Sequence, residues 1–98
     1  MKYLLLITRK TGAEPTADVW IRHKEWVQQE VKQGTIEVPY TFAGSTHGMC
    51  IVNAETPEDL NDLMMAAPAG PFADVEVRPL ADFAKQMDRV AAAMKRAG

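Results

Sequence analysis

The stretch TIEVPYTFAGSTHGMCIVN, residues 35–53, decides the fold. Its first half has apolar side chains at every second position, which predicts a strand with one buried face: Ile36, Val38, Tyr40 and Phe42. Pro39 has no N–H to donate, so we expect this strand at a sheet edge, or with a bulge at that point. A turn at residues 44–46 then leads into a second predicted strand, residues 47–53.

A predicted helix flanks this pair of strands on each side. Thr16 or Asp18 can cap the earlier helix, which ends at Gly34. Thr56 can cap the later helix, with Pro57 in its first turn. The middle of the chain is therefore helix, strand, strand, helix.

One more strand is predicted at each end of this arrangement. Residues 2–9 are rich in apolar, β-favouring side chains, and residues 72–80 alternate valines with charged side chains. The order βαββαβ is the ferredoxin-like pattern, an α+β fold with a four-stranded antiparallel sheet and both helices on one face. Because a single small domain has no layer left for the other face, a second copy is the expected cover. We therefore expect a homodimer, a dimeric α+β barrel, or a higher homo-oligomer.

The last residues form a separate predicted element. We expect the barrel domain at residues 1–80 and a C-terminal helix at residues 81–98. Apolar residues recur there at intervals of three and four, the mark of an amphipathic helix: Leu80, Phe83, Met87, Val90 and Met94. This helix is either an arm that docks on a partner or a third helix that packs on its own subunit.

Composition excludes several classes of protein. A chain of 98 residues is one domain, and its net charge of −2 offers no basic surface to nucleic acid or to anionic membranes. Cys50 is the only cysteine, which fits a reducing compartment. The apolar run at residues 3–7 is too short for a secretory signal. These features indicate a cytoplasmic protein.

The segment DVWIRHKEWVQQEV, residues 18–31, carries the most unusual pattern. On a helical wheel, His23 and Glu30 fall on the apolar stripe, with Trp20 and Trp26 beside it. The opposite face carries the other polar residues: Arg22, Lys24, Glu25, Gln28 and Gln29. Burying polar groups is unfavourable unless they find partners, and departures from the binary pattern tend to mark functional sites. The alternative is a core histidine with its hydrogen bonds satisfied, and Glu30 reaching solvent at the helix end.

Other catalytic or metal-binding arrangements have less support. His47 and Cys50 lie three apart on a strand, so they point to opposite faces and do not suit a zinc site. The chain has no phosphate-binding loop and no dinucleotide fingerprint. We expect no metal and no cofactor. A nucleophilic pair of Cys50 and His23 is a further alternative.

From Gly34 to Leu80 the chain resembles the muconolactone Δ-isomerase family. The resemblance is carried mainly by PAGPFADVEVRPL, residues 68–80, and extends without gaps back to about Val19. It implies a ferredoxin-like protomer, a dimeric barrel and cofactor-free proton transfer in a small lactone. A looser similarity links the chain to YCII-like proteins, which also place a histidine on the first helix.

The resemblance also implies three site positions. The family uses a carboxylate on its first helix, with a tyrosine and an asparagine on its third strand. By position these fall on His23, Thr46 and Gly48, so none of the three residue types is retained. His23 still supplies a titratable group, whose unperturbed pKa near 6.5 suits proton transfer.

Our hypothesis from the sequence is a cofactor-independent, isomerase-like enzyme acting on a small lactone, cyclic or polyketide-like substrate. His23 moves the proton and Glu30 orients the substrate or a water. The expected substrate-binding residues are Trp20, Trp26, Tyr40, Phe42, Thr46 and Cys50. Two alternatives stay open: a non-catalytic dimeric protein that binds a small ligand or acts as an accessory subunit, and a cofactor-free monooxygenase.

Overall fold

The computed structural model describes residues 1–12 and 14–98. Its elements follow the predicted order and comprise β1 (Lys2–Arg9), α1 (Ala17–Gln33), β2 (Ile36–Thr41), β3 (Gly48–Asn53), α2 (Pro57–Ala66), the short 3-10 turn η1 (Gly70–Phe72), β4 (Ala73–Leu80) and α3 (Phe83–Ala97). The loop expected at residues 10–15 includes Ala13, which lies outside the described residues.

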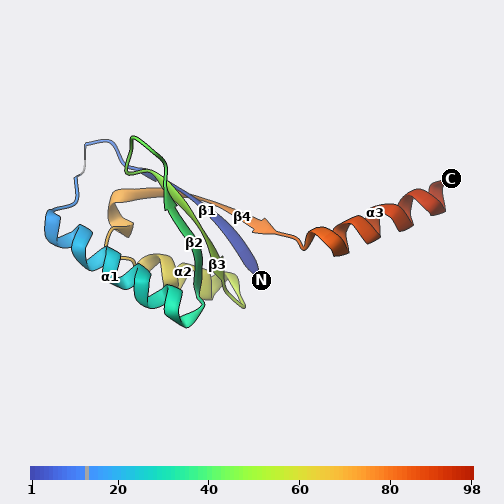
Figure 1. Ribbon diagram of the computed structural model, residues 1–98, viewed down its shortest axis with the longest axis horizontal. Coiled ribbons are helices and arrows are strands. Elements are labelled where there is room, and N and C mark those ends of the chain that lie inside the picture. Colours follow the sequence, from blue (N-terminus) through green and yellow to red (C-terminus); the bar gives the residue numbers. More distant parts are fainter. Residues whose placement is uncertain (13) are drawn as a thin grey trace.

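The four strands form one antiparallel sheet in the order β2-β3-β1-β4. Both α1 and α2 cover the same face of this sheet (Figure 1). The predicted α+β, ferredoxin-like arrangement is confirmed, and β2 is an edge strand as Pro39 requires.

The caps expected from the sequence hold the ends of both covering helices. The Thr16 hydroxyl accepts a hydrogen bond from the Val19 N–H at 3.3 Å, and Thr56 accepts one from the Asp59 N–H at 3.1 Å. Gly34 ends α1 with φ of 80°, a left-handed conformation that glycine adopts without steric cost. These stops set the length of α1 and hence the part of the sheet that it covers.

The core lies between the sheet and the helices. It consists of Tyr3, Leu5, Ile36, Cys50, Val52 and Leu60. The opposite, outer face of the sheet also carries apolar side chains, since Leu4 pairs with Ile51 and Leu6 with Met49. Among the described residues, no helix covers this outer face (Figure 1). One sheet therefore has one covered and one uncovered apolar face.

The expected alternation in β2 is wrong beyond Ile36. The register breaks between Glu37 and Tyr40, and Val38 has a φ of 52°, so a bulge inserts at Pro39. Tyr40 pairs with Met49 and therefore belongs to the outer face. Phe42 lies beyond the end of the strand. An extra residue at the bulge reverses the facing of every later side chain.

The last helix, α3, stands away from the rest of the chain (Figure 1). Every residue from Ala81 to Gly98 is exposed. The molecule measures 59 × 27 × 23 Å and has a radius of gyration of 16.7 Å, against about 13 Å for a compact chain of this length. The alternative in which α3 packs on its own subunit does not agree with this structure. Within the described residues, no helix combines the length and apolar character needed to span a bilayer.

Candidate active site

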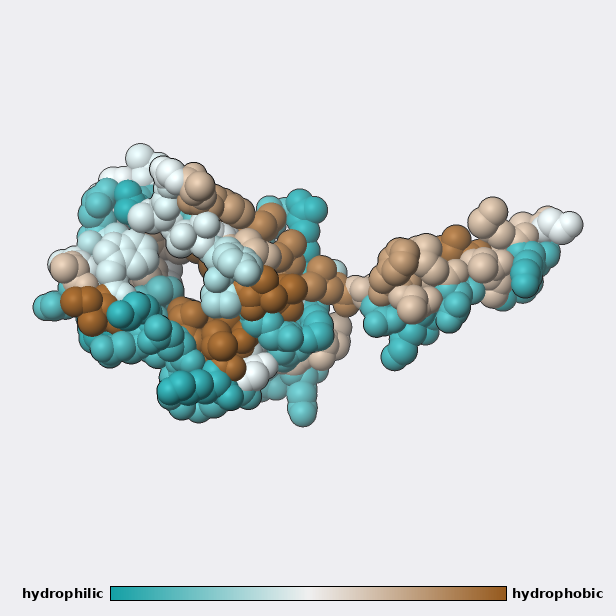
Figure 2. All heavy atoms as spheres, viewed as in Figure 1, coloured by the Kyte–Doolittle hydropathy of each residue, from teal (hydrophilic) through white to brown (hydrophobic). Residues whose placement is uncertain are grey.

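A cavity of about 450 Å³ lies between the sheet and α1. This volume falls within the range of small-molecule sites. Its walls come mostly from apolar side chains of all four strands, α1 and the end of α2. Figure 2 shows an opening through this part of the molecule, so the hollow is accessible from solvent.

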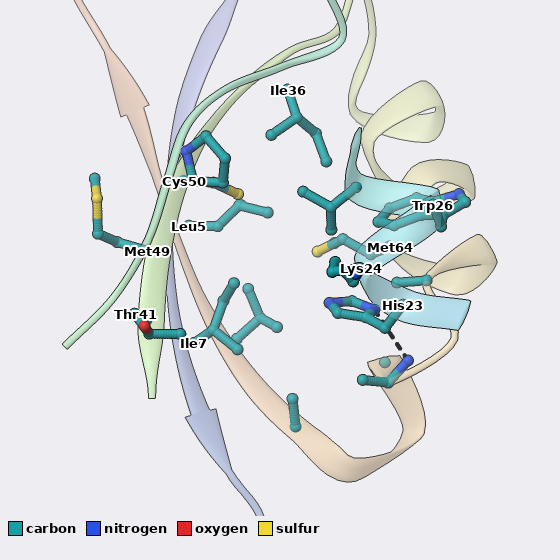
Figure 3. A pocket seen from close by; sticks show the side chains of 18 of the residues that line it. Leu5, Ile7, His23, Lys24, Trp26, Ile36, Thr41, Met49, Cys50 and Met64 are labelled. Carbon is teal, nitrogen blue, oxygen red and sulfur yellow. Dashed lines mark hydrogen bonds between the residues drawn. The ribbon is translucent and has the colours of Figure 1, made fainter. Parts of the chain in front are cut away.

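His23 projects from α1 into this cavity, toward β1 and β3 (Figure 3). Its Nδ1 accepts a hydrogen bond from the backbone N–H of Ala69 at 3.2 Å. Ala69 is buried in the segment that joins α2 to η1. The ring is thus held from two elements that are 46 residues apart in the sequence.

This hydrogen bond defines the state of the ring. A backbone N–H can only donate, so Nδ1 carries a lone pair and the neutral ring holds its proton on Nε2. Burial lowers the pKa of His23 below its ordinary value, which also favours the neutral ring. His23 therefore offers an N–H donor at Nε2 at neutral pH.

Two tryptophans one turn away flank the imidazole. The Trp26 ring lies stacked on it, with centroids 5.8 Å apart and planes inclined by 29°. The Trp20 ring meets it edge to face, with centroids 6.2 Å apart. Both tryptophans also line the cavity. They give the histidine apolar surroundings and restrict its rotation.

The charged side chains on the cavity wall are basic. Arg9 and Lys24 line it, and no Asp or Glu of the described residues does. Arg9 forms an ion pair with Glu14 at 2.8 Å, which offsets part of its charge. Among the described residues, no carboxylate lies within ion-pair distance of Lys24, whose side chain thus keeps its charge available at the cavity.

Six of the eight expected site residues line the cavity: Trp20, His23, Trp26, Tyr40, Thr46 and Cys50. Tyr40 is among them although the β2 bulge turns that residue toward the outer face, and its side chain is 66% exposed. Glu30 and Phe42 are not part of the wall. The backbone oxygen of Glu30 accepts hydrogen bonds at the end of α1.

The buried thiol of Cys50 lines the cavity and is not suited to act as a nucleophile. Burial raises its pKa to about 11, so the thiol stays protonated at neutral pH. The nucleophilic pair of Cys50 and His23 is therefore not supported by this geometry.

Several residues that line the cavity were not predicted from the sequence. Lys24 and Gln28 were expected on the far side of α1, but the cavity is wide enough to include this flank of the helix. The Ala69 N–H has no signal in the sequence, because any residue except proline supplies it. Arg9 could have been found, since it shares the helix-facing side of β1 with Leu5 and Ile7.

The three positions implied by the resemblance, His23, Thr46 and Gly48, all line this one cavity. A side chain at Gly48 would not fit the present backbone. A Cβ placed there would come within 2.4 Å of the Tyr40 carbonyl oxygen. The family's asparagine is thus excluded at this position unless β2 moves.

Comparisons with known proteins agree with this architecture. The family model described as muconolactone delta-isomerase matches residues 1–86. A crystal structure of muconolactone isomerase superposes with a TM-score of 0.70 at 23% identity, covering 84% of this chain and 90% of that one.

A second solved structure has the same fold. It is 5-chloro-2-hydroxyhydroquinone dehydrochlorinase (TftG) from Burkholderia phenoliruptrix in complex with 2,5-dihydroxybenzoquinone. It superposes with a TM-score of 0.65 at 17% identity, covering 83% of this chain and 94% of that one. No curated protein matches the chain.

Proposed function

Because the chain belongs to the muconolactone delta-isomerase family, we propose that it is an enzyme that moves a proton within a small cyclic substrate. Such a shift of a double bond requires no cofactor. The observation that carries the proposal is a titratable ring, His23, on the wall of an open and mostly apolar cavity of about 450 Å³. A filled core around this ring would have favoured a structural histidine instead.

The substrate we propose is a small anion with a conjugated carbonyl group. Lys24 and Arg9 on the wall, without a carboxylate beside them among the described residues, favour a negatively charged ligand. The apolar remainder of the wall suits a ring of carbon atoms. The names of the structural neighbours suggest two test classes, lactones such as muconolactone and hydroxylated quinones.

In this proposal His23 has two tasks. Its Nε2–H donates a hydrogen bond to the carbonyl oxygen and stabilises the negative charge that develops there when a ring proton leaves. When its own proton is on Nδ1 instead, the imidazole is our candidate for accepting the ring proton at Nε2 and returning it to another carbon, so the two tasks belong to different tautomers and do not occur in the same step. Trp20, Trp26 and Cys50 shape the space around the substrate.

The second task needs the other neutral tautomer. To accept a proton at Nε2, the ring must carry its own proton on Nδ1, and the Ala69 contact of 3.2 Å must open. Losing this hydrogen bond costs about 1–3 kcal/mol. The gain is one group that can both take the proton from one carbon and deliver it to the next.

We further propose that the working unit is a homodimer in which a second copy covers the outer face of the sheet. Leu4, Leu6, Met49 and Ile51 supply the apolar surface for that contact. These side chains are half-buried, and an apolar sheet face that no helix of the described residues covers marks an association surface.

The second candidate is a non-catalytic protein that binds the same class of ligand. It is favoured by Thr46 and Gly48, which stand where the family carries its tyrosine and asparagine. The two candidates separate in one assay, because only the enzyme exchanges substrate protons with solvent.

The test is proton exchange in D₂O, followed by NMR on muconolactone and on a dihydroxybenzoquinone. We expect deuterium to enter the substrate with the native protein, and His23→Asn to reduce the rate about 10²–10⁴-fold. Asparagine keeps an acceptor near the position of Nδ1 while removing the titratable ring. The matched control is His47→Asn, since His47 does not line the cavity. Equal rates for the two variants would remove His23 from the mechanism, and binding without exchange would support the second candidate.

A further inference from the structure

The guanidinium of Arg9 stands at one end of the cavity. Leu5, Ile7 and Arg9 alternate on the helix-facing side of β1, and all three line the cavity. The Arg9 side chain is only 28% exposed. Lys24, also on the wall, is exposed on α1, where water weakens its interaction with other charges. A charged group inside the cavity therefore interacts more strongly with Arg9 than with Lys24.

This guanidinium has an internal counter-ion. Its Nη2 group donates a hydrogen bond to Oε1 of Glu14 at 2.8 Å. Within residues 1–12 and 14–98 this is the only hydrogen bond of the Arg9 side chain, although a guanidinium has five N–H donors in a planar fork. Glu14 does not line the cavity, and its side chain is 76% exposed. Most of the fork is thus unused, and its one partner comes from the solvent side.

An ion pair with an exposed partner is easily replaced. Such pairs contribute little to stability, because solvent screens the attraction. A ligand carboxylate inside the cavity can accept two parallel N–H bonds from the same guanidinium, and the mostly apolar wall strengthens these bonds. Glu14 stays in water after the exchange, so no charge is left buried without a partner. The exchange therefore replaces a weak contact with a stronger one.

We propose that Arg9 anchors a carboxylate of the substrate, and that Glu14 is the counter-ion that this carboxylate displaces. The contact is a specificity device, since a neutral ligand has nothing to offer the guanidinium in place of Glu14. The inference rests on the proposed function for the position of the reacting carbonyl group at His23. The anchor itself is a matter of binding and does not require the reaction.

The place of the anchor narrows the class of substrate. Figure 3 shows His23 and Ile7 on opposite sides of the cavity. Arg9 lies two residues farther along β1 than Ile7, a rise of about 7 Å. The anchored carboxylate is thus set apart from the carbonyl group at His23. The substrate class that fits is a ring that carries its carboxylate on a side chain.

The first experiment measures the dissociation constants of two such acids, muconolactone and phenylacetate, and of their uncharged methyl esters. The fluorescence of Trp20 and Trp26, both on the wall, reports binding. We expect Arg9→Gln to raise the dissociation constants of the acids about tenfold or more and to leave those of the esters nearly unchanged. Arg9→Lys keeps the charge but loses the fork, and should lie between the two. Equal losses for acids and esters would overturn the anchor, and so would a native chain that binds neither acid.

The second experiment isolates Glu14. Glu14→Gln removes the competing charge, so we expect it to lower the dissociation constants of both acids about two- to fivefold and to leave the esters unchanged. Glu55→Gln changes the net charge equally at an exposed position outside the cavity wall, and is the matched control. Constants that Glu14→Gln leaves unchanged, or that Glu55→Gln lowers by the same factor, would overturn the displacement. Phenylacetate is not a lactone, so its binding is read without the proposed reaction, and failure of the anchor is distinguished from failure of proton transfer.

Discussion

Helices α1 and α3 are both amphipathic and have 17 and 15 residues. They differ in whether residues of the same chain cover the apolar face. The stripe of α1 is interrupted by His23, yet it faces the sheet across a cavity. The apolar residues of α3, namely Phe83, Met87, Val90 and Met94, pack on none of the residues 1–80 that the structure describes. Periodicity therefore predicts that a helix has an apolar face, but not which molecule covers that face.

The two helices also leave apolar surface uncovered in different shapes. Beneath α1 the surface is enclosed as a hollow, which suits a small molecule. Along α3 it is convex and linear, which suits another protein. We expect mutations to distinguish the two helices in the same way.

The largest difference in stability is expected between two aromatic truncations. Trp26→Ala removes a ring that packs on the core and on His23, and should lower the free energy of unfolding by up to about 3 kcal/mol. Phe83→Ala removes a ring that is 75% exposed, and should leave the stability of the dilute monomer unchanged. Urea denaturation of both variants at low protein concentration measures the two effects. Similar losses for the two variants would mean that α3 packs on residues 1–80 of its own chain.

A smaller difference is expected between the two helix caps. Thr16→Ala removes the cap of α1 and should lower the free energy of global unfolding by about 1 kcal/mol. Asp82→Ala removes the cap of α3 and should reduce helicity in circular dichroism, while the urea midpoint of the dilute chain stays in place. A shift of that midpoint would mean that α3 is coupled to the stability of residues 1–80.

The smallest expected effect is the pH dependence that His23 contributes to stability. Burial lowers its pKa in the folded state, so below about pH 6.5 the unfolded chain binds a proton that the folded chain does not. Stability should therefore fall as pH drops through 6.5, and level off once the folded ring is also protonated. His23→Asn should flatten this part of the profile, whereas His47→Asn should keep it. A native profile without this fall would contradict the half-buried ring.

Most of the fold was predictable because local chemistry and pattern agreed. Thr16, Gly34 and Thr56 mark helix ends by mechanisms that act within a few residues, and the structure has them in those roles. Pro39 predicted an edge position or a bulge for β2, and the strand has both. The facing of Tyr40 was missed, because one inserted residue is enough to reverse it and the sequence does not say where the register resumes.

The site was predictable only in part, because the extent of a cavity depends on how closely the surrounding elements pack. The wheel placed His23, Trp20 and Trp26 together, and they meet as expected. It could not show that the hollow extends to Lys24 or stops before Glu30, since both depend on the distance between helix and sheet. The hydrogen bond from Ala69 was equally hidden, because it comes from the main chain.

The hydrogen bond to His23 comes from the main chain of Ala69, so it does not depend on which side chain stands at that position. Nineteen of the twenty standard amino acids at position 69 would present the same donor to His23, and only proline would not. Two prolines already stand close by, at positions 68 and 71. Related proteins could therefore change the side chain at position 69, within the space that this buried site allows, and keep the imidazole in the same tautomer, whereas a proline at position 69 would remove the donor.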